Sequence, residues 1–278
     1  EIIVINDGSK DATLQVLIEQ FGLLPYPEAY RVQIPTQEVR TIYRSTRHAN
    51  LRVLDKLNGG KADSLNAGIN SSRYPLFCGV DADSILQRDS LQKVVQPFLR
   101  SPEMVATGGT IRAANGCDVR GGDLYKVDLP SNPWALFQVM EYLRAFLFGR
   151  LGWSSMNAML IISGAFGLFR KQTVIDVGGY RTQTIGEDME LIVRIHHQLR
   201  EQGMQRALAE HPQVRLRQLV YSGWTRQRAY EQARQLVSRY PKVSLVWAAN
   251  DEMAFGAMHA FAEAGKAPGK DVLFSAVN

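Results

Sequence analysis

The chain has 278 residues, of which 45% are hydrophobic, so it is long enough for one large domain or two modest ones. Its formal net charge is +5, but the basic residues are dispersed and form no stripe or known binding motif, so we expect no nucleic-acid partner. The only two cysteines, Cys78 and Cys117, exclude a disulfide framework.

The first predicted element is a buried strand over residues 1–5, which ends in Asn6-Asp7-Gly8-Ser9. Apolar residues then recur at helical spacing from Leu14 to Phe21. This order predicts a strand, a tight turn and a helix that begins near Ser9 or Asp11.

A second polar and glycine-rich segment runs from Lys56 to Gly68 and contains Asn58-Gly59-Gly60-Lys61. Glycines at 59 and 60 allow the backbone to approach a ligand closely, although ordinary turn chemistry explains them equally well. Lys61 follows them directly, which places a cation beside this flexible backbone.

The next apolar run, residues 76–80, ends in Asp81-Ala82-Asp83. Side chains two apart on an extended segment point to the same side, so we expect the carboxylates of Asp81 and Asp83 to converge. Such oxygens suit Mg²⁺ or Mn²⁺ that keeps positions open for a phosphate. A solvated turn is the alternative interpretation.

Residues 151–169 carry no charge, and their number approaches the ~20 residues that span a bilayer. Serines and glycines dilute this stretch, including Ser163-Gly164, so we expect a buried strand and a site loop rather than a membrane helix. Downstream, Gly186-Glu187-Asp188 opens a helical run. Acidic residues in a first turn also fit simple capping, and that alternative stays open.

Taken together in this order, the Asn6–Ser9, Lys56–Gly68, Asp81–Asp83, Ser163–Gly167 and Gly186–Asp188 segments resemble the family 2 glycosyltransferases, especially the membrane polysaccharide synthases. The resemblance covers roughly residues 1–200. It implies an inverting hexosyltransferase with a GT-A fold: an α/β architecture with a mixed, mostly parallel sheet and flanking helices.

The resemblance also implies a role for each motif. Asp7 would bind the nucleotide base, and Lys61 would lie near the base or diphosphate. Asp81 and Asp83 would hold a nucleotide sugar through Mg²⁺ or Mn²⁺. Asp188 would be the general base, and Ser163, Gly164 and Glu187 would border the donor and acceptor sugars.

The partners implied are a nucleotide sugar, with UDP as the expected nucleotide, and a saccharide acceptor. For the full-length parent, the resemblance implies membrane association at the cytoplasmic face of the inner membrane. In this family a further strand and helix precede the Asp-Gly-Ser strand, and processive members carry a Gln-x-x-Arg-Trp motif. We find neither here, so we expect an incomplete transferase whose own activity is doubtful.

The character of the sequence changes near residue 200. Strands are expected at 214–221, 243–249 and 271–277, with helices at 226–240 and 251–264 between them, which predicts a βαβαβ unit with parallel pairing. This tail, residues 205–278, resembles part of the C-terminal lobe of type 1 periplasmic sugar-binding proteins. The resemblance implies sugar contacts for Asn250, Asp251 and Asn278, although Asn250 and Asp251 also fit a helix N-cap.

We therefore expect two domains, 1–200 and 205–278, and interpret the chain as an artificial or recombined fusion with its junction between residues 198 and 206. The parent of the tail would be periplasmic. Two other functions stay open: a non-catalytic sugar-binding module formed by the tail, and a sugar-nucleotide pyrophosphorylase. The pyrophosphorylase requires an early glycine-rich phosphate loop followed by a lysine, which the Asp7-Gly8-Ser9 turn does not provide.

Overall fold

The computed structural model describes residues 1–155, 159 and 161–276. The chain divides into two compact units, Glu1–Gln202 and Gly203–Asn278. Helix α7 (Glu187–Glu210) runs across the boundary between them. The expected junction at 198–206 is therefore helical rather than an exposed linker. The reason is that its residues are mostly good helix formers, and a single glycine, Gly203, is tolerated inside a helix.

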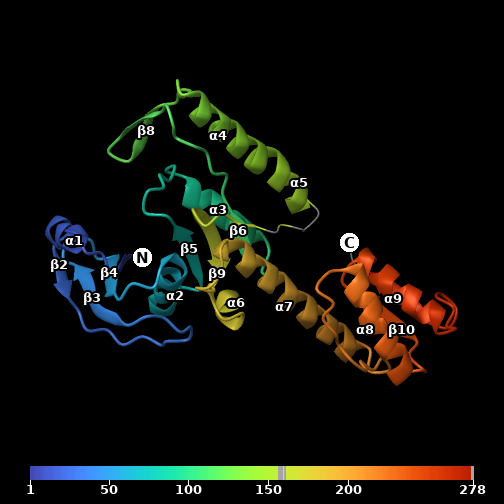
Figure 1. Cartoon of the computed structure of the whole chain (residues 1–278). Helices are drawn as coiled ribbons and strands as arrows, with labels where there is room; N and C mark the ends of the chain where they lie inside the picture. Colours follow the sequence, from blue (N-terminus) through green and yellow to red (C-terminus); the bar gives the residue numbers. More distant parts are fainter. Residues whose placement is uncertain (156–158, 160, 277–278) are drawn as a thin grey trace. The chain divides into compact units, whose positions relative to one another are not determined.

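The first sheet of unit 1 has the strand order β1-β4-β3-β2 (Figure 1). Its strands are β1 (Ile2–Asp7), β2 (Leu23–Pro25), β3 (Val39–Ser45) and β4 (Leu51–Lys56). Strand β1 pairs with β4 in parallel, whereas β3 is antiparallel to both β4 and β2. Helix α1 (Thr13–Phe21) follows β1, and α2 (Lys61–Ser71) packs against β1. Both β1 and β4 end where the Lys56–Lys61 loop begins.

The second sheet has the order β5-β9-β6. Strand β9 (Phe166–Arg170) lies between β5 (Leu76–Val80) and β6 (Ala106–Gly108) and is antiparallel to both. The mixed α/β architecture predicted from the sequence is confirmed, but the expected predominance of parallel pairing is wrong. Within the described part of unit 1, only β1 and β4 pair in parallel. Strands β2, β3 and β4 follow one another as antiparallel neighbours, and β9 lies between β5 and β6, which both run opposite to it.

Unit 1 also contains a hairpin and several more helices. They are α3 (Ser90–Arg100), the hairpin β7 (Asp118–Arg120) and β8 (Asp123–Lys126), α4 (Pro133–Leu143), the π-helical segment η1 (Arg144–Gly149), α5 (Arg150–Ser155) and α6 (Lys171–Asp176). Of the uncharged stretch 151–169, the described residues form most of α5, loop residues at 159 and 161–165, and most of β9. No helix in the described part of the chain has both the length and the apolar character needed to cross a bilayer.

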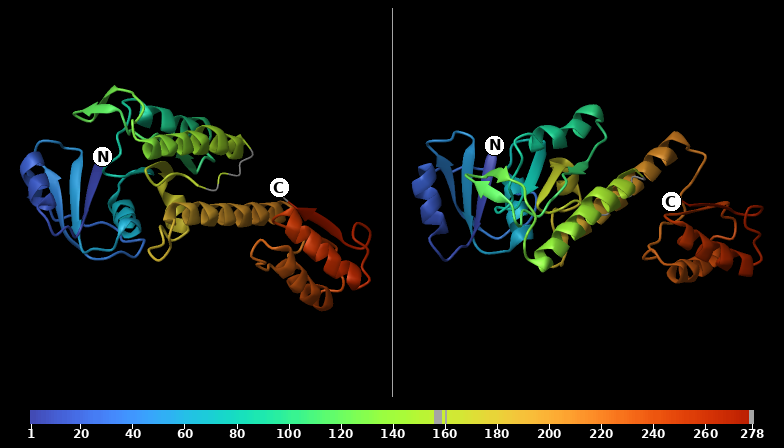
Figure 2. Two further views of the ribbon diagram at one scale, coloured as in Figure 1. Left: turned by 45° about the horizontal axis from the view of Figure 1, so that its top comes forward. Right: turned by 90° about the horizontal axis from the view of Figure 1, so that it is seen from above.

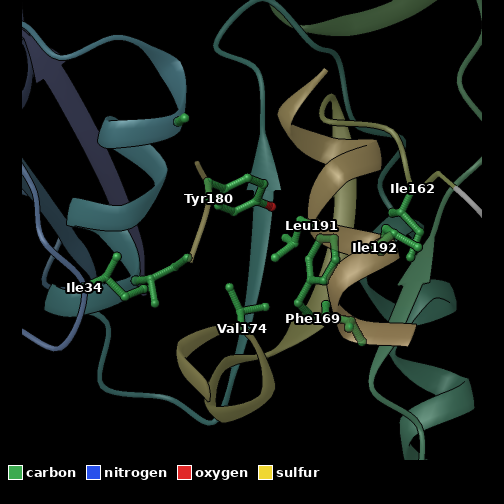
Figure 3. Packing of buried hydrophobic residues seen from close by; sticks show 10 residues of the cluster. Ile34, Ile162, Phe169, Val174, Tyr180, Leu191 and Ile192 are labelled. Carbon is green, nitrogen blue, oxygen red and sulfur yellow. The ribbon is translucent and has the colours of Figure 1, made fainter. Parts of the chain in front are cut away.

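A buried apolar cluster fixes the start of α7 against β9 (Figure 3). Leu191 and Ile192 from α7 pack with Phe169 of β9 and Val174 of α6, and all four side chains are buried. Tyr180, in the loop before α7, is also a buried member. The first turn of α7, which carries Asp188, is therefore held by well-packed neighbours on the following turn.

Besides the end of α7, the described part of unit 2 contains two helices and two parallel strands. They are α8 (Arg226–Arg239), β10 (Leu245–Ala248), α9 (Asp251–Glu263) and β11 (Leu273–Ala276). Helices α8 and α9, orange and red, lie side by side in both views of Figure 2. They approach so closely that a Cβ atom on Gly256 would lie 2.3 Å from the backbone oxygen of Arg226.

The expected first strand of this unit, residues 214–221, is not a strand. Its sequence alternates apolar and polar residues at first, but a strand also requires a partner edge. These residues are almost all exposed and join no ladder among the described strands. The expected βαβαβ unit is thus an αβαβ unit in which β10 and β11 pair with each other.

Candidate active site

Four segments that are distant in sequence meet around Gly164. Lys61 is the first residue of α2, Asp81 follows β5, Gly164 precedes β9, and Asp188 lies in the first turn of α7. The Lys61 Nζ atom is 2.5 Å from Asp81 Oδ1, and the Gly164 N–H donates to Asp188 Oδ2 at 3.1 Å. The fold thus brings Lys61, Asp81, Gly164 and Asp188 into one site.

A side chain at position 164 would lie close to two residues of the site. A Cβ atom there would lie 3.2 Å from Lys61 Nζ and 3.6 Å from Asp188 Oδ2. The first distance is shorter than an ordinary van der Waals contact, so a side chain at this position would press on the lysine ammonium. The absence of a side chain keeps the amine of Lys61 and the carboxylate of Asp188 within reach of the same small volume.

The two carboxylate oxygens of Asp188 have different partners. Oδ1 accepts from the N–H of Met189 at 2.9 Å, which satisfies a free donor of the helix start, whereas Oδ2 accepts from Gly164 across the site. The charge of Asp188 also reaches its neighbours. Burial raises the pKa of the Tyr180 hydroxyl, and the charges of Asp188 and Glu187 raise it further. Burial lowers the pKa of Arg150, and the charge of Asp188 opposes that change.

Asp81 and Asp83 do not lie on one extended segment, so the expectation that alternation makes them converge is wrong. Strand β5 ends at Val80, and the next residues form a turn in which the Ser84 N–H donates to the backbone oxygen of Asp81 at 3.0 Å. Asp81 is half-buried and paired with Lys61, while Asp83 is exposed in the turn. Among the described residues, no three His, Cys, Asp or Glu side chains form a group that could hold a metal ion.

The donor chemistry of this turn nevertheless fits Mg²⁺ or Mn²⁺. These hard cations use one or two carboxylates and take their other ligands from water and substrate phosphates. Asp81 and Asp83 supply oxygens of this kind at an accessible turn. A metal ion at Asp81 would compete with the ammonium of Lys61 for the same carboxylate.

Asp7, at the end of β1, lies in a cradle formed by residues 56–60. Its carboxylate accepts from the Lys56 ammonium at 2.5 Å, from the Gly59 N–H at 2.9 Å and from the Gly60 N–H at 2.7 Å. Burial raises the pKa of Asp7, but these hydrogen bonds and the charge of Lys56 outweigh it and hold the pKa below its ordinary value. Asp7 is therefore ionised at neutral pH.

Lys56 of this cradle and its partner Asp63 were not among the predicted site residues. Both are buried, and the Lys56 Nζ atom is 2.6 Å from Asp63 Oδ2. The signal that could have identified them is the composition of β4, because charged residues in a covered strand require buried partners. A third missed residue is Asn66 of α2. Its side-chain amide donates to the Tyr180 backbone oxygen and accepts from the Tyr180 N–H, each at 2.8 Å.

The other predicted residues of the sugar loop lie nearby but show fewer contacts. Ser163 is half-buried, and its hydroxyl accepts from the Ala165 N–H at 3.3 Å, which shapes the turn into β9. Glu187 is the first residue of α7 and is also half-buried. Their roles toward a sugar stay predictions.

In unit 2, the Asn250 side chain accepts from the Met253 N–H at 2.8 Å and caps helix α9. The capping interpretation of Asn250 is therefore confirmed. Asp251 is exposed in the first turn of the same helix. Asn278 lies outside the described residues, so the structure does not bear on its expected sugar contact.

Comparison with known proteins gives two family matches. Residues 29–219 match the glycosyltransferase like family 2, and residues 194–276 match a periplasmic binding protein domain. Poly-beta-1,6-N-acetyl-D-glucosamine synthases are similar over the first region. The protein from Staphylococcus epidermidis is 27% identical over 197 residues, and that from Staphylococcus aureus (strain COL) is 29% identical over 199 residues. Each alignment covers 70% of this chain, which spans 38% of the length of these curated relatives.

Two solved structures are also similar to parts of the chain. A periplasmic sugar-binding protein from Pseudomonas fluorescens is 69% identical over 29% of this chain and 25% of that chain, with a TM-score of 0.29. A mannosyltransferase from Pyrobaculum calidifontis, solved in complex with GDP-Man and Mn²⁺, is 18% identical over 70% of this chain and 42% of that chain, with a TM-score of 0.43.

Proposed function

Because the chain belongs to the glycosyltransferase like family 2, we propose that unit 1 transfers a sugar, with inversion, from a nucleoside diphosphate sugar to a saccharide acceptor. We propose a UDP-sugar as donor and polysaccharide synthesis as the process. The observation that carries this proposal is the convergence of Lys61, Asp81 and Asp188 around Gly164. The family match favours this function over the pyrophosphorylase alternative.

Asp188 would act as the general base. An acceptor hydroxyl is a poor nucleophile until a positioned carboxylate takes its proton. Asp188 Oδ2 already faces the loop at Gly164 with one hydrogen bond, and a carboxylate oxygen has room for a second one. An acceptor hydroxyl bound beside Gly164 would therefore donate to this oxygen and lose its proton there as the new bond forms.

Lys61 would stabilise the opposite end of the reaction. The leaving nucleoside diphosphate gains negative charge as the bond to the sugar breaks, and a fixed ammonium lowers the energy of that charge. In the absence of nucleotide, Asp81 holds this ammonium at 2.5 Å. Mg²⁺ or Mn²⁺ held by Asp81 and Asp83 would supply Lewis-acid stabilisation of the same diphosphate.

We extend the proposal to the location of the complete protein from the relatives alone. The synthases that the chain matches make a polysaccharide according to their name, and this chain spans 38% of their length. We propose that the complete transferase acts at the cytoplasmic face of a membrane, where the nucleotide sugar is available. The parent of the tail would be periplasmic, in accordance with its domain match.

Titration calorimetry with UDP, with and without Mn²⁺, tests the nucleotide and metal assignments together. We expect binding that requires the metal and that loses its metal-dependent part in Asp83→Ala, because the metal loses a charged ligand. Asp89→Ala is a matched control, since Asp89 lies six residues further along the chain and its side chain is 48% exposed. UDP binding that is unchanged in Asp83→Ala, or unchanged by a chelator, would contradict the metal site.

A second candidate function is sugar binding by unit 2, which the periplasmic binding protein match favours. The same calorimetry with free monosaccharides tests it. Binding that is lost in Asp251→Ala but not in Asp83→Ala would support a sugar site on the tail. We expect no such binding, because the Asn250 amide oxygen already accepts the hydrogen bond of the helix cap.

A further inference from the structure

Lys56 is a fully buried lysine, and all of its hydrogen-bonding capacity is used inside the chain. Its side chain has 0% exposure. Its ammonium donates to Asp7 Oδ1 at 2.5 Å and to the Leu57 oxygen at 2.6 Å, and it lies 2.6 Å from Asp63 Oδ2. An ammonium has three N–H groups, so these three partners satisfy it completely. A buried charge with such complete pairing fixes the position of its partners.

The two carboxylate oxygens of Asp7 face different surroundings: Oδ1 points toward the partly buried side and Oδ2 toward the exposed side. Oδ1 accepts from Lys56 and from Gly59, and these bonds are partly buried. Oδ2 accepts from the Gly60 N–H at 2.7 Å and from the Asn58 amide at 3.2 Å, and these bonds are exposed. The bond from Asn58 is the longest of the four, so it is the one that an incoming donor would replace.

Asp63 is the second carboxylate that pairs with the Lys56 ammonium. It is 4% exposed, and its carboxylate also accepts from the Gln37 N–H. Its Oδ2 would lie 2.5 Å from a Cβ atom on Gly59, so the 57–60 loop packs directly on this carboxylate. Lys56 therefore joins the end of β1, the end of β4 and the first turn of α2 at a single atom.

We propose that Lys56 is a positioning residue of the nucleobase subsite: it holds Asp7 with Oδ2 outward, so that this oxygen accepts the N–H of a uracil base in place of the Asn58 amide. This inference rests on the proposed function and deepens it. Lys56 itself does not touch the nucleotide, because it is buried behind Asp7.

The inference predicts a selectivity among bases. Uracil has a donor N–H at N3, whereas cytosine has an unprotonated N3 that a carboxylate oxygen would repel. A rigid, outward Oδ2 should therefore favour UDP over CDP, since a cytosine base would cover this oxygen without offering it a hydrogen-bond donor. Without Lys56, the carboxylate of Asp7 is free to turn, and this preference should shrink while contacts to the diphosphate remain.

The test compares the affinities of UDP, CDP and inorganic pyrophosphate, all with Mn²⁺, in the full chain. Lys56→Met alone leaves the carboxylates of Asp7 and Asp63 without their shared cationic partner, and it risks unfolding because Asp63 is buried. It is therefore paired with Lys56→Met/Asp63→Asn, which removes the buried charge. Asp63→Asn alone is the background control. Arg40→Met is a cation-to-methionine control, because the hydrogen bonds of the Arg40 guanidinium go to Asp55 and to the Lys56 backbone oxygen rather than to Asp7.

We expect the UDP-to-CDP affinity ratio to fall by roughly 10-fold or more in the double variant, with pyrophosphate affinity retained, as for loss of one charge-assisted hydrogen bond. If the double variant has the same UDP-to-CDP affinity ratio as Asp63→Asn, or loses affinity equally for all three ligands, the inference about Lys56 is wrong. The proposed function would not be affected by either result. Lys56→Arg, which keeps the charge, should restore part of the ratio. Wild-type protein that binds neither UDP nor pyrophosphate would instead overturn the proposed function, and the inference would fall with it.

Discussion

The replacement of Asp188 by Asn separates a catalytic role from a capping role. Asn caps a helix about as well as Asp, so the start of α7 should survive. The carboxylate accepts two hydrogen bonds, from Met189 and from Gly164, on different oxygens. Asn has only one oxygen, so one of these bonds is lost, which costs about 0.5–1.5 kcal/mol of stability.

The expected effect on turnover is much larger. An amide cannot take the proton of the acceptor hydroxyl, and loss of a general base typically slows a reaction by ~10²–10⁴-fold. This loss corresponds to about 2.7–5.4 kcal/mol in the activation free energy. The difference between the two magnitudes makes the roles distinguishable, because a cap alone would affect stability and turnover only slightly.

The assay measures UDP release from the sugar nucleotide in the presence of acceptor, with UDP affinity and thermal unfolding measured in parallel. Asp89→Asn is a matched control, because Asp89 directly precedes a helix, α3, and its side chain is 48% exposed. We expect near-normal UDP affinity in both variants and a loss of turnover only in Asp188→Asn. Near-normal turnover in Asp188→Asn would refute the general-base assignment and leave Asp188 as a cap.

Three further outcomes follow from the structure. Gly256→Ala should destabilise unit 2 by about 1–3 kcal/mol, as seen by chemical denaturation, because the new methyl group would meet the Arg226 backbone; an unchanged midpoint would contradict the close packing of α8 on α9. Limited trypsin digestion should cut first within residues 211–221, which are exposed and lack regular structure, rather than at 198–206 inside α7. Burial raises the pKa of the Cys78 thiol to about 11, so its contribution to stability should persist below its ordinary pKa near 9 and be lost as the pH rises toward 11; a pH series of unfolding free energies, with Cys78→Ala as control, measures this.

The sequence predicted the site best where a motif stands at the end of a regular element. The convergence of Lys61 with Asp81, and of Gly164 with Asp188, was expected from the resemblance, and the structure brings these residues together. Each of them lies within two residues of the end of a strand or the start of a helix, apart from the loop glycine. Their placement in one site was implied by the resemblance of the ordered motifs to a known family.

The sequence did less well where the outcome depends on a tertiary partner. Residues 214–221 have a strand-like pattern but no edge to pair with, and residues 198–206 look like a boundary but continue α7. The buried pairing of Lys56 with Asp63 was missed because periodicity marks apolar faces and cannot show which charged side chain meets which. Such pairs are decided by the packing of β4 against α2.

The bidentate amide contact of Asn66 with Tyr180 also bears on the order in which the chain folds. The two residues are 114 positions apart, and α2, which carries Asn66 and Lys61, is complete long before the chain reaches Asp188. Closing so long a loop is entropically costly and is typical of slow, non-local steps. During synthesis on the ribosome, the polar groups of α2 would therefore stay hydrated until residues 180–195 emerge and dock against them. Conditions that slow this late docking, rather than those that weaken either half, should govern the yield of competent protein.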